Sequence, residues 1–157
     1  MNVLDDPTLR FAVVDVETSG LSVHRHRVLQ VGVVVVDGTG AVIDRWASLV
    51  RPRRRFFHRV GPTRLHGIHR RDVRGAPLLA DVMQRLAATI DGAVFVAHNA
   101  EFDLAFLRKA AAEAEGDAKG ADYSGRFDIR LDATGACDCP AVAGMDLCNN
   151  ELTTLAS

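Results

Sequence analysis

Two carboxylates follow the first apolar run of the sequence at a spacing that could bind a cation. Residues 11–16 are mostly apolar and rich in β-branched side chains, a pattern typical of a strand buried on both faces. Asp15 and Glu17 stand at its end, so a strand would point both to one face, roughly 7 Å apart along the backbone. Like charges placed this way are costly unless a cation compensates them, and a divalent ion is the usual solution. The alternative is a strand that frays into a polar loop.

A third carboxylate, Asp103, lies in the apolar stripe of a predicted helix. Counted by the helical period, it shares a face with Phe102 and Phe106. A carboxylate near a helix N-terminus gains from the local dipole, which is the structural explanation for an acid at this position. Burial among aromatic side chains would cost more than that gain unless a cation compensates. Asp103 is therefore a second candidate ligand position.

The elements that must position these acids form an α/β pattern. Three strands joined by short connections predict an antiparallel meander, at residues 11–17, 28–36 and 41–50. A helix starting at Pro77, a buried strand at 93–97 and a helix at 98–116 follow. An alternating stretch at 127–131 predicts an edge strand. We therefore expect a five-stranded mixed sheet flanked by helices, in which Asp15, Glu17 and Asp103 converge to metal-bridging distance.

Length and composition indicate a globular protein without a membrane span. The chain has 157 residues, 48% of them hydrophobic and 25% charged, which fits one domain with a sizeable core. No apolar run approaches membrane-spanning length, and the N-terminus lacks the pattern of a signal peptide, so a cytoplasmic location is expected. Cys137, Cys139 and Cys148 make a poor disulfide framework. They could hold zinc, but no His lies near them.

The net charge of −1 conceals a strongly basic segment. Residues 51–74 contain nine Arg and one Asp, a charge of +8, so the rest of the chain carries −9. A basic block of this kind suggests contact with a polyanion, and Arg53, Arg54 and Arg55 are candidates for phosphate contacts. The alternative is a solvated face or a loop paired with acidic residues of this chain.

Two segments resemble the first two motifs of the DEDD exonucleases, in the branch of the proofreading epsilon subunit of bacterial DNA polymerase III. They are DVETSG at 15–20 and AHNAEFD at 97–103, and residues 65–68 and 75–77 resemble the connecting segment of that family. The similarity extends over residues 11–114. It implies a ribonuclease H-like fold and 3′→5′ removal of nucleotides from single-stranded DNA or RNA ends. It also implies two Mg²⁺ or Mn²⁺ ions, a role in DNA replication and repair, and association with a polymerase.

The resemblance also implies roles for individual residues. Asp15 would bridge both ions, and Glu17 and Asp103 would each bind one, consistent with the preference of hard cations for oxygen ligands. The Leu21 side chain would wedge against the terminal base. The substrate-binding residues implied in this way are Thr18, Ser19, Gly20, Leu21, His98, Asn99 and Phe102. None of these contacts depends on the identity of the base, so degradation should depend little on the nucleotide sequence.

The third motif of that family is absent from this chain. It consists of a His, the general base, and an Asp five residues later, yet no His follows Asp103. Tyr123 and Asp128 resemble a tyrosine variant, but their spacing is one residue too long. We therefore assign no general base. We expect an exonuclease-like domain at 1–131 and a divergent or irregular tail at 132–157, so that the C-terminal part of the fold is incomplete.

Three functional hypotheses follow. The first is a metal-dependent 3′→5′ exonuclease, impaired by loss of the third motif. The second is a non-catalytic nucleic-acid-binding relative that keeps the fold and the basic segment. The third is an assembly subunit whose partner chain covers the incomplete sheet face. Truncation, a shifted reading frame and divergence all remain open as causes of the unusual C-terminus, and the sequence does not separate DNA from RNA as substrate.

Overall fold

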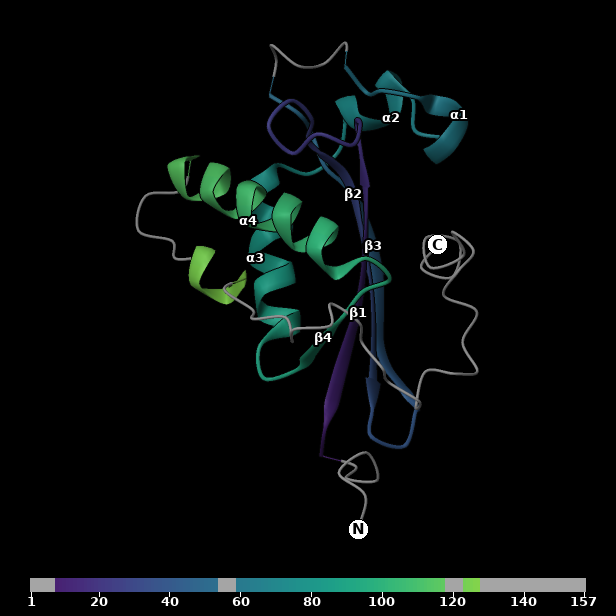
Figure 1. Ribbon diagram of the computed structural model, residues 1–157, viewed down its shortest axis with the longest axis vertical. Helices are drawn as coiled ribbons and strands as arrows, with labels where there is room; N and C mark the ends of the chain where they lie inside the picture. The colour runs from purple at the N-terminus through teal and green to yellow at the C-terminus, as the bar shows by residue number, and fades with distance from the viewer. Residues whose placement is uncertain (1–7, 54–58, 118–122, 128–157) are drawn as a thin grey trace.

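A mixed sheet of four strands organises the part of the chain that the structure, a computed structural model, describes: residues 8–53, 59–117 and 123–127 (Figure 1). The strands are β1 (Arg10–Thr18), β2 (Val28–Asp37), β3 (Val42–Leu49) and β4 (Val94–Val96), in the order β3-β2-β1-β4. β2 pairs antiparallel with both β1 and β3, whereas β4 pairs parallel with β1. The predicted α/β mixed sheet, a meander followed by a parallel strand, is confirmed.

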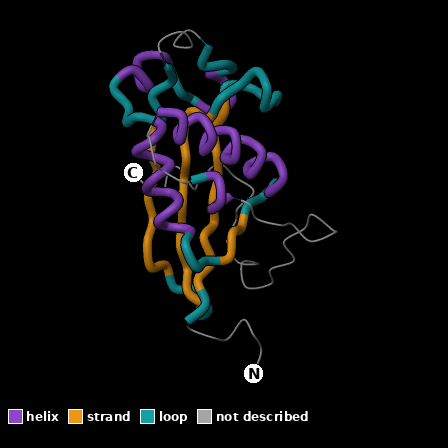
Figure 2. Tube along the Cα trace, turned by 90° about the vertical axis from the view of Figure 1, so that its left-hand side faces the viewer, coloured by secondary structure: helices purple, strands orange, loops and turns teal. Residues whose placement is uncertain are grey.

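Two long helices cover one face of this sheet. They are α3 (Leu79–Ile90) and α4 (Ala100–Asp117), and both lie in front of the strands in Figure 2. Two short helices, α1 (Thr63–His66) and α2 (Arg70–Arg74), lie at the end of the molecule where β1 stops (Figure 1). A 3₁₀ helix follows at Ser124–Phe127. No helix in these described stretches is both long and apolar enough to cross a bilayer.

Strand β1 is buried on both faces, as its composition predicts. Val14 and Val16 pack toward α3 and α4 in the main core, beside Leu86 and Phe106. The alternate positions of β1, Phe11 among them, belong to a second cluster with neighbouring strands. Because side chains alternate along a strand, Asp15 and Glu17 point to that second face, away from the two long helices. The register of β1 therefore decides which face carries the acids.

The expected fifth strand is not found in the described residues. Phe127, its predicted first residue, lies in the 3₁₀ helix and is fully buried. Its carbonyl oxygen accepts a hydrogen bond from Arg108 Nε (2.9 Å), so α4 holds this segment against the helical layer and not at a sheet edge. Residues 128–131, the predicted domain boundary and the three cysteines lie outside the described part of the chain.

Two local details differ from the sequence pattern. Val42 and Ile43 are about half exposed because β3 is an edge strand, whereas Trp46 on the same strand is buried. Helix α3 begins at Leu79 and not at Pro77. A parallel bridge between Arg51 and Leu78 keeps that stretch extended, with the Arg51 N–H donating to the Pro77 carbonyl (2.8 Å).

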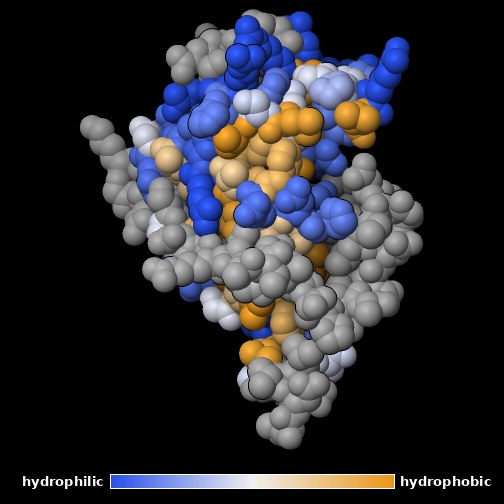
Figure 3. Space-filling model, in the orientation of Figure 1, coloured by the Kyte–Doolittle hydropathy of each residue, from blue (hydrophilic) through white to orange (hydrophobic). Residues whose placement is uncertain are grey.

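The two short helices were not predicted, because the basic segment that contains them has no clear hydrophobic period. A small cluster anchors them: Val60, Ile68 and Val73 pack with Leu29 of β2. The arginines face outward, and Figure 3 shows hydrophilic side chains crowning this end of the molecule. A few apolar contacts are therefore enough to present a basic surface beside the end of β1.

Candidate active site

Asp15 and Glu17 lie half-buried at the carboxyl end of β1. On the neighbouring strand β2, Asp15 pairs with Gly32 and Glu17 with Gln30, so no opposing charge faces either acid across this pair of strands. Burial raises the pKa of both carboxyls, and the charge of Asp15 raises that of Glu17 further. The positive charge of His98 partly opposes the shift at Asp15. These two acids therefore carry more negative charge than their surroundings compensate.

Asp103 reaches the same place from the first turn of α4. Strand β4 ends at Val96, which pairs with Val13, so β1 continues past its partner on that side. The Val16 N–H donates to Asp103 Oδ1 (3.3 Å) instead, which ties the helix to the free stretch of β1. Asp103 is only 5% exposed, so the prediction that it is buried is confirmed. Burial, followed by the charge of Asp15, raises its pKa to about 7.

The three acids are neighbours, but they do not form a preassembled metal cage. Asp15 is close enough to raise the pKa of both Glu17 and Asp103. Yet no three His, Cys, Asp or Glu side chains in the described residues are already grouped as a metal site would group them. The expected convergence to metal-bridging distance is therefore not found.

The donor set nevertheless fits a hard divalent cation. All three side chains offer carboxylate oxygens, the ligands that Mg²⁺ and Mn²⁺ prefer. Their pKa values are raised mainly by burial and, for Glu17 and Asp103, also by the charge of Asp15, so their ionised forms are costly at this site. A cation placed among Asp15, Glu17 and Asp103 would supply the missing positive charge and relieve that cost.

The loop between β1 and β2 holds Leu21 out into solvent. Thr18 Oγ1 donates to the Gly20 carbonyl (2.8 Å), and the Ser19 N–H donates to the carbonyl of Arg27 at the other end of the loop (2.9 Å). Ser19 Oγ is hydrogen-bonded to His26 Nδ1 (3.3 Å) and accepts from the Arg27 N–H (3.1 Å). Ser19 is buried, whereas Leu21 is 86% exposed. The loop is therefore closed at its base and presents an apolar side chain beside the acids.

The basic segment approaches this loop closely at Gly61. A Cβ at Gly61 would lie 2.1 Å from the Ser19 carbonyl oxygen, so only glycine permits the backbone to approach this closely. Its φ of 75° also lies in the left-handed region that favours glycine. The chain that carries the exposed arginines is in this way packed directly against the loop after β1.

Gly61→Ala is expected to lower the free energy of unfolding by roughly 2–4 kcal/mol, through left-handed strain plus the clash with Ser19. Gly67→Ala is the matched control, because Gly67 has a similar φ of 70° but open space around its Cα. The control should cost only about 1–2 kcal/mol from strain. Urea unfolding of both variants measures the difference. Equal losses would show that the Gly61–Ser19 approach is not tight in solution.

The remaining predicted substrate residues lie at the start of α4, with mixed roles. Asn99 Oδ1 accepts from the Phe102 N–H (3.4 Å), so its side chain caps the helix as well as facing solvent. His98 is exposed, and its charge acts on Asp15. Phe102 is half-buried with its ring 4.8 Å from that of Phe106. These three residues therefore border the acids, but Asn99 and Phe102 also have structural partners.

The basic segment divides into two parts. Arg53 pairs with Asp117 on α4 (2.7 Å) and Arg51 Nε donates to the Ala76 carbonyl (2.9 Å), so both hold elements of the fold together. Arg54 and Arg55 lie outside the described residues. The arginines of the short helices and their flanks are exposed: Arg59, Arg64, Arg70, Arg71 and Arg74. Among the described arginines of the segment, these five are exposed and are not tied to α4, whereas Arg53 is.

Two contacts that shape the site were not predicted from the sequence. Lys109 reaches from α4 to the carbonyls of Val23 and His26, some 85 residues earlier. Gly61 meets Ser19 across 42 positions of the sequence. Lys109 reads as an ordinary polar-face residue and Gly61 as an ordinary turn glycine, so no local signal marks either one.

Comparison with known proteins places the chain in a family. The RNase_T exonuclease family matches residues 12–123, more than half of the sequence. The chain belongs to the RNase_T exonuclease family. The resemblance of its two acidic motifs to exonucleases is thereby confirmed.

Members of the family share about 100 residues with this chain. A PolC-type DNA polymerase III of Caldanaerobacter subterraneus is 34% identical over 101 residues, 64% of this chain and 7% of that protein. A DNA polymerase III subunit epsilon-like protein of Rhodobacter capsulatus is 39% identical over 103 residues, 64% and 14% of the two chains. The 3′-5′ exonuclease DinG of Bacillus subtilis is 32% identical over 100 residues, 63% and 10%. The chain thus spans only a small part of these relatives.

Solved structures agree on the fold. Product-bound exonuclease I superposes with a TM-score of 0.60 at 18% identity, over 68% of this chain and 26% of that one. E. coli exonuclease I in complex with a dA16 oligonucleotide gives the same TM-score at 17% identity, over 68% and 24%. At such identities the agreement concerns the fold, which is that of the ribonuclease H-like exonucleases.

Proposed function

We propose that this chain is a 3′→5′ exonuclease domain that hydrolyses phosphodiester bonds at single-stranded DNA ends with two divalent metal ions. The observation that carries the proposal is the contact of Asp103 with the Val16 N–H, which brings a buried acid from α4 to the two acids of β1. Membership of the RNase_T exonuclease family and the three carboxylates fit the same chemistry. Structures of E. coli exonuclease I with dA16 and dT13 support single-stranded DNA as the substrate class.

Asp15, Glu17 and Asp103 would hold the two ions, with Asp15 shared between them. Bound there, Mg²⁺ or Mn²⁺ would supply an activated hydroxide and neutralise charge on the attacking and leaving oxygens. Asp103 keeps its position because its carboxylate accepts from the Val16 N–H, with the backbone of Asn99 and of Asp103 itself also acting on it. Glu17 lies two residues beyond Asp15 on the same face and extends the acidic surface toward the loop.

The loop after β1 would bind the 3′-terminal nucleotide. Leu21, 86% exposed, would pack against the terminal base, while Thr18, Ser19 and Gly20 shape the backbone beneath it. His98, Asn99 and Phe102 would border the nucleotide from the α4 side. An apolar wedge recognises any base through its face, so cleavage should depend little on sequence. The exposed arginines beside α1 and α2 would draw the phosphate backbone toward this end.

The missing third motif should make this enzyme slow. No His follows Asp103, so the chain lacks the residue that would take the proton from the attacking water. A positioned acid–base group contributes about 10²–10⁴-fold to a rate. A fourth acidic ligand is absent with it. On this proposal residues 1–131 form the exonuclease-like domain, and 132–157 a divergent or irregular tail.

We expect slow, Mn²⁺-favoured shortening of a 5′-labelled single-stranded oligonucleotide from its 3′ end, about 10²–10⁴-fold slower than the Rhodobacter relative. EDTA should abolish the shortening, and a 3′-blocked oligonucleotide serves as the control for polarity. Gel analysis of the product ladder gives rate and direction together. A rate equal to that of the relative would contradict the predicted impairment.

A non-catalytic nucleic-acid-binding relative is the second candidate, favoured by the exposed arginines and the absent third motif. It predicts salt-dependent binding of the same oligonucleotide with no shortening in Mn²⁺. An assembly subunit, the third candidate, predicts stability that rises with the concentration of a polymerase or other partner chain.

A further inference from the structure

Lys109 connects helix α4 to the loop that follows β1. Its ammonium nitrogen donates to the carbonyl oxygens of Val23 (2.6 Å) and His26 (2.8 Å). The side chain is 24% exposed, so these bonds are partly shielded from water. Two carbonyls in the second half of the loop are thus held by one cation from a distant part of the chain.

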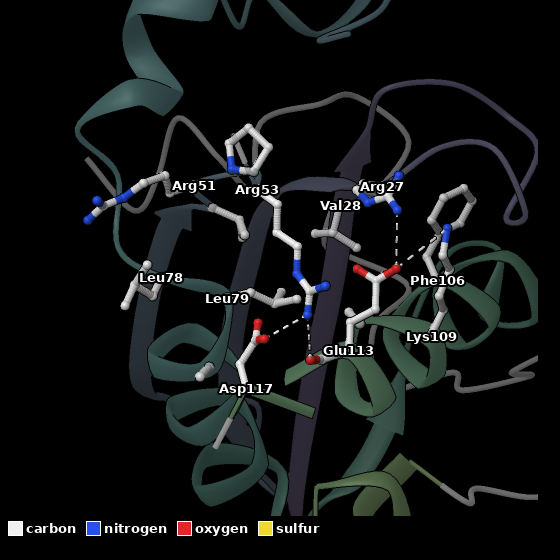
Figure 4. Close-up of a pocket in the computed structure, with 14 residues that line it drawn as sticks. Arg27, Val28, Arg51, Arg53, Leu78, Leu79, Phe106, Lys109, Glu113 and Asp117 are labelled. Carbon is white, nitrogen blue, oxygen red and sulfur yellow. Dashed lines mark hydrogen bonds and ion pairs between the residues drawn. The ribbon is translucent and has the colours of Figure 1, made fainter. Parts of the chain in front are cut away.

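Glu113, one turn further along α4, reinforces this connection. It lies 4.0 Å from Lys109 Nζ and 3.5 Å from the guanidinium of Arg27, where the loop ends. Figure 4 shows both cations directed at this one carboxylate, at the edge of a cavity of about 270 Å³ floored by Val28, Leu79 and Phe106. The cavity does not include the acids of the active site. Lys109 and Glu113 therefore fasten the loop along its base.

The helix that carries Asp103 also holds the loop. Lys109 follows Asp103 by six residues, about 9 Å along an α-helix. Asp103 is bonded to the end of β1 and Lys109 to the loop after it, so α4 sets the position of both relative to each other. Leu21 is exposed within that loop, and its side chain has no core contact of its own to hold it.

We propose that Lys109 is a positioning residue that fixes the loop of residues 19–27 so that Leu21 meets the 3′-terminal nucleotide at a set distance from Asp103. This inference rests on the proposed exonuclease function. Lys109 touches neither the acids nor the nucleotide in this arrangement, so it acts on substrate binding and not on the chemical step. The alternative is that Lys109 only satisfies two carbonyls and stabilises the fold.

The test compares three variants of the full chain. Lys109→Met keeps the aliphatic stem but has no donor, and Lys109→Arg keeps donors and charge. Arg45→Met, on the exposed edge strand β3, removes one positive charge away from the loop and is the control. Hydrogen exchange of residues 19–27 in EDTA reports on the loop without any turnover. Single-turnover and steady-state assays in Mn²⁺ give kcat and KM for a single-stranded oligonucleotide.

In Lys109→Met we expect faster exchange at residues 19–27 with little change across β1 and β4. KM should rise about tenfold, the size expected for losing hydrogen bonds from a charged donor, with kcat within about twofold. Lys109→Arg should recover at least half of the change in KM on a logarithmic scale, and Arg45→Met should match the wild type in loop exchange and KM.

Two results would overturn the inference. One is unchanged exchange of residues 19–27 in a folded Lys109→Met protein. The other is faster loop exchange with KM unchanged, which would reduce Lys109 to a structural role. If the wild type shows no turnover, the proposed function fails separately. Oligonucleotide affinity in Ca²⁺ then replaces KM, and an affinity equal to that of the wild type in Lys109→Met would overturn the inference as well.

Discussion

Asp15→Asn is expected to reduce metal-dependent shortening of single-stranded DNA by 10²–10³-fold or more, the scale on which removal of one preorganised charge-stabilising group acts. Asparagine keeps the shape of the side chain but removes the charge between Glu17 and Asp103. An ion at this site would then keep only Glu17 and Asp103 as carboxylate ligands. The rate of product release from a 5′-labelled oligonucleotide in Mn²⁺ measures the loss.

Asp44→Asn provides the matched control for this substitution. Asp44 is an exposed acid on edge strand β3, so its replacement removes the same charge from the same sheet without approaching the site. The control should retain the wild-type rate. If Asp15→Asn stays folded and trims at that rate too, Asp15 binds no catalytic ion and the two-metal proposal is wrong.

Asp103→Asn is expected to make the metal-free protein more stable near pH 7, although it should impair catalysis. The pKa of Asp103 rises from 3.8 to about 7 on folding, so the folded state binds a proton that the unfolded state releases. Protonation of Asp103 therefore stabilises the folded state. Its contribution to the free energy of unfolding is fully present below pH 3.8 and is lost as pH rises to about 7. The difference of about three pKa units corresponds to at most about 4 kcal/mol.

The amide of the asparagine still accepts from the Val16 N–H, but it carries no charge to desolvate. Between pH 4 and pH 7, the free energy of unfolding of the variant should therefore fall much less than that of the wild type. Asp15 and Glu17, whose pKa values are also raised, leave a smaller decline of the same sign. Urea unfolding in EDTA at several pH values measures these slopes, with Asp44→Asn again as control.

Divalent ions should act in the opposite direction. Mn²⁺ binds the folded state, so it should raise the stability of the wild type at pH 7 by mass action and raise that of Asp103→Asn less. A wild type whose stability increases from pH 5 to pH 7 in EDTA would show that Asp103 is ionised at little cost. The uncompensated negative charge at this site would then be disproved.

Several features were predictable from the sequence because they depend on local periodicity. The strand at residues 10–18 is an apolar run, and its two-residue alternation puts Asp15 and Glu17 on one face in any sheet. The helical period likewise puts Asp103 among aromatic residues, and its burial is confirmed. The two acidic motifs identify the family for the same reason, since each motif lies within one element and its loop.

The same alternation predicted a fifth strand at 127–131, of which only Phe127 lies in the described residues, and Phe127 shows the limit of periodicity. Phe127 alternates with polar neighbours, yet it packs against α4 in a 3₁₀ helix, since a buried aromatic side chain is stabilised by whichever layer can cover it. The helices α1 and α2 were missed for the opposite reason, because their few apolar residues follow no period.

Only the tertiary structure decided how the acids and the loop meet. The early end of β4 leaves the Val16 N–H free for Asp103, Gly61 lets the basic segment press against Ser19, and Lys109 ties α4 to the loop. Each of these contacts joins residues 42–87 positions apart and uses a backbone group as one partner. Backbone groups are the same in every residue, so a sequence names the side chains at a site but not the peptide groups that hold them.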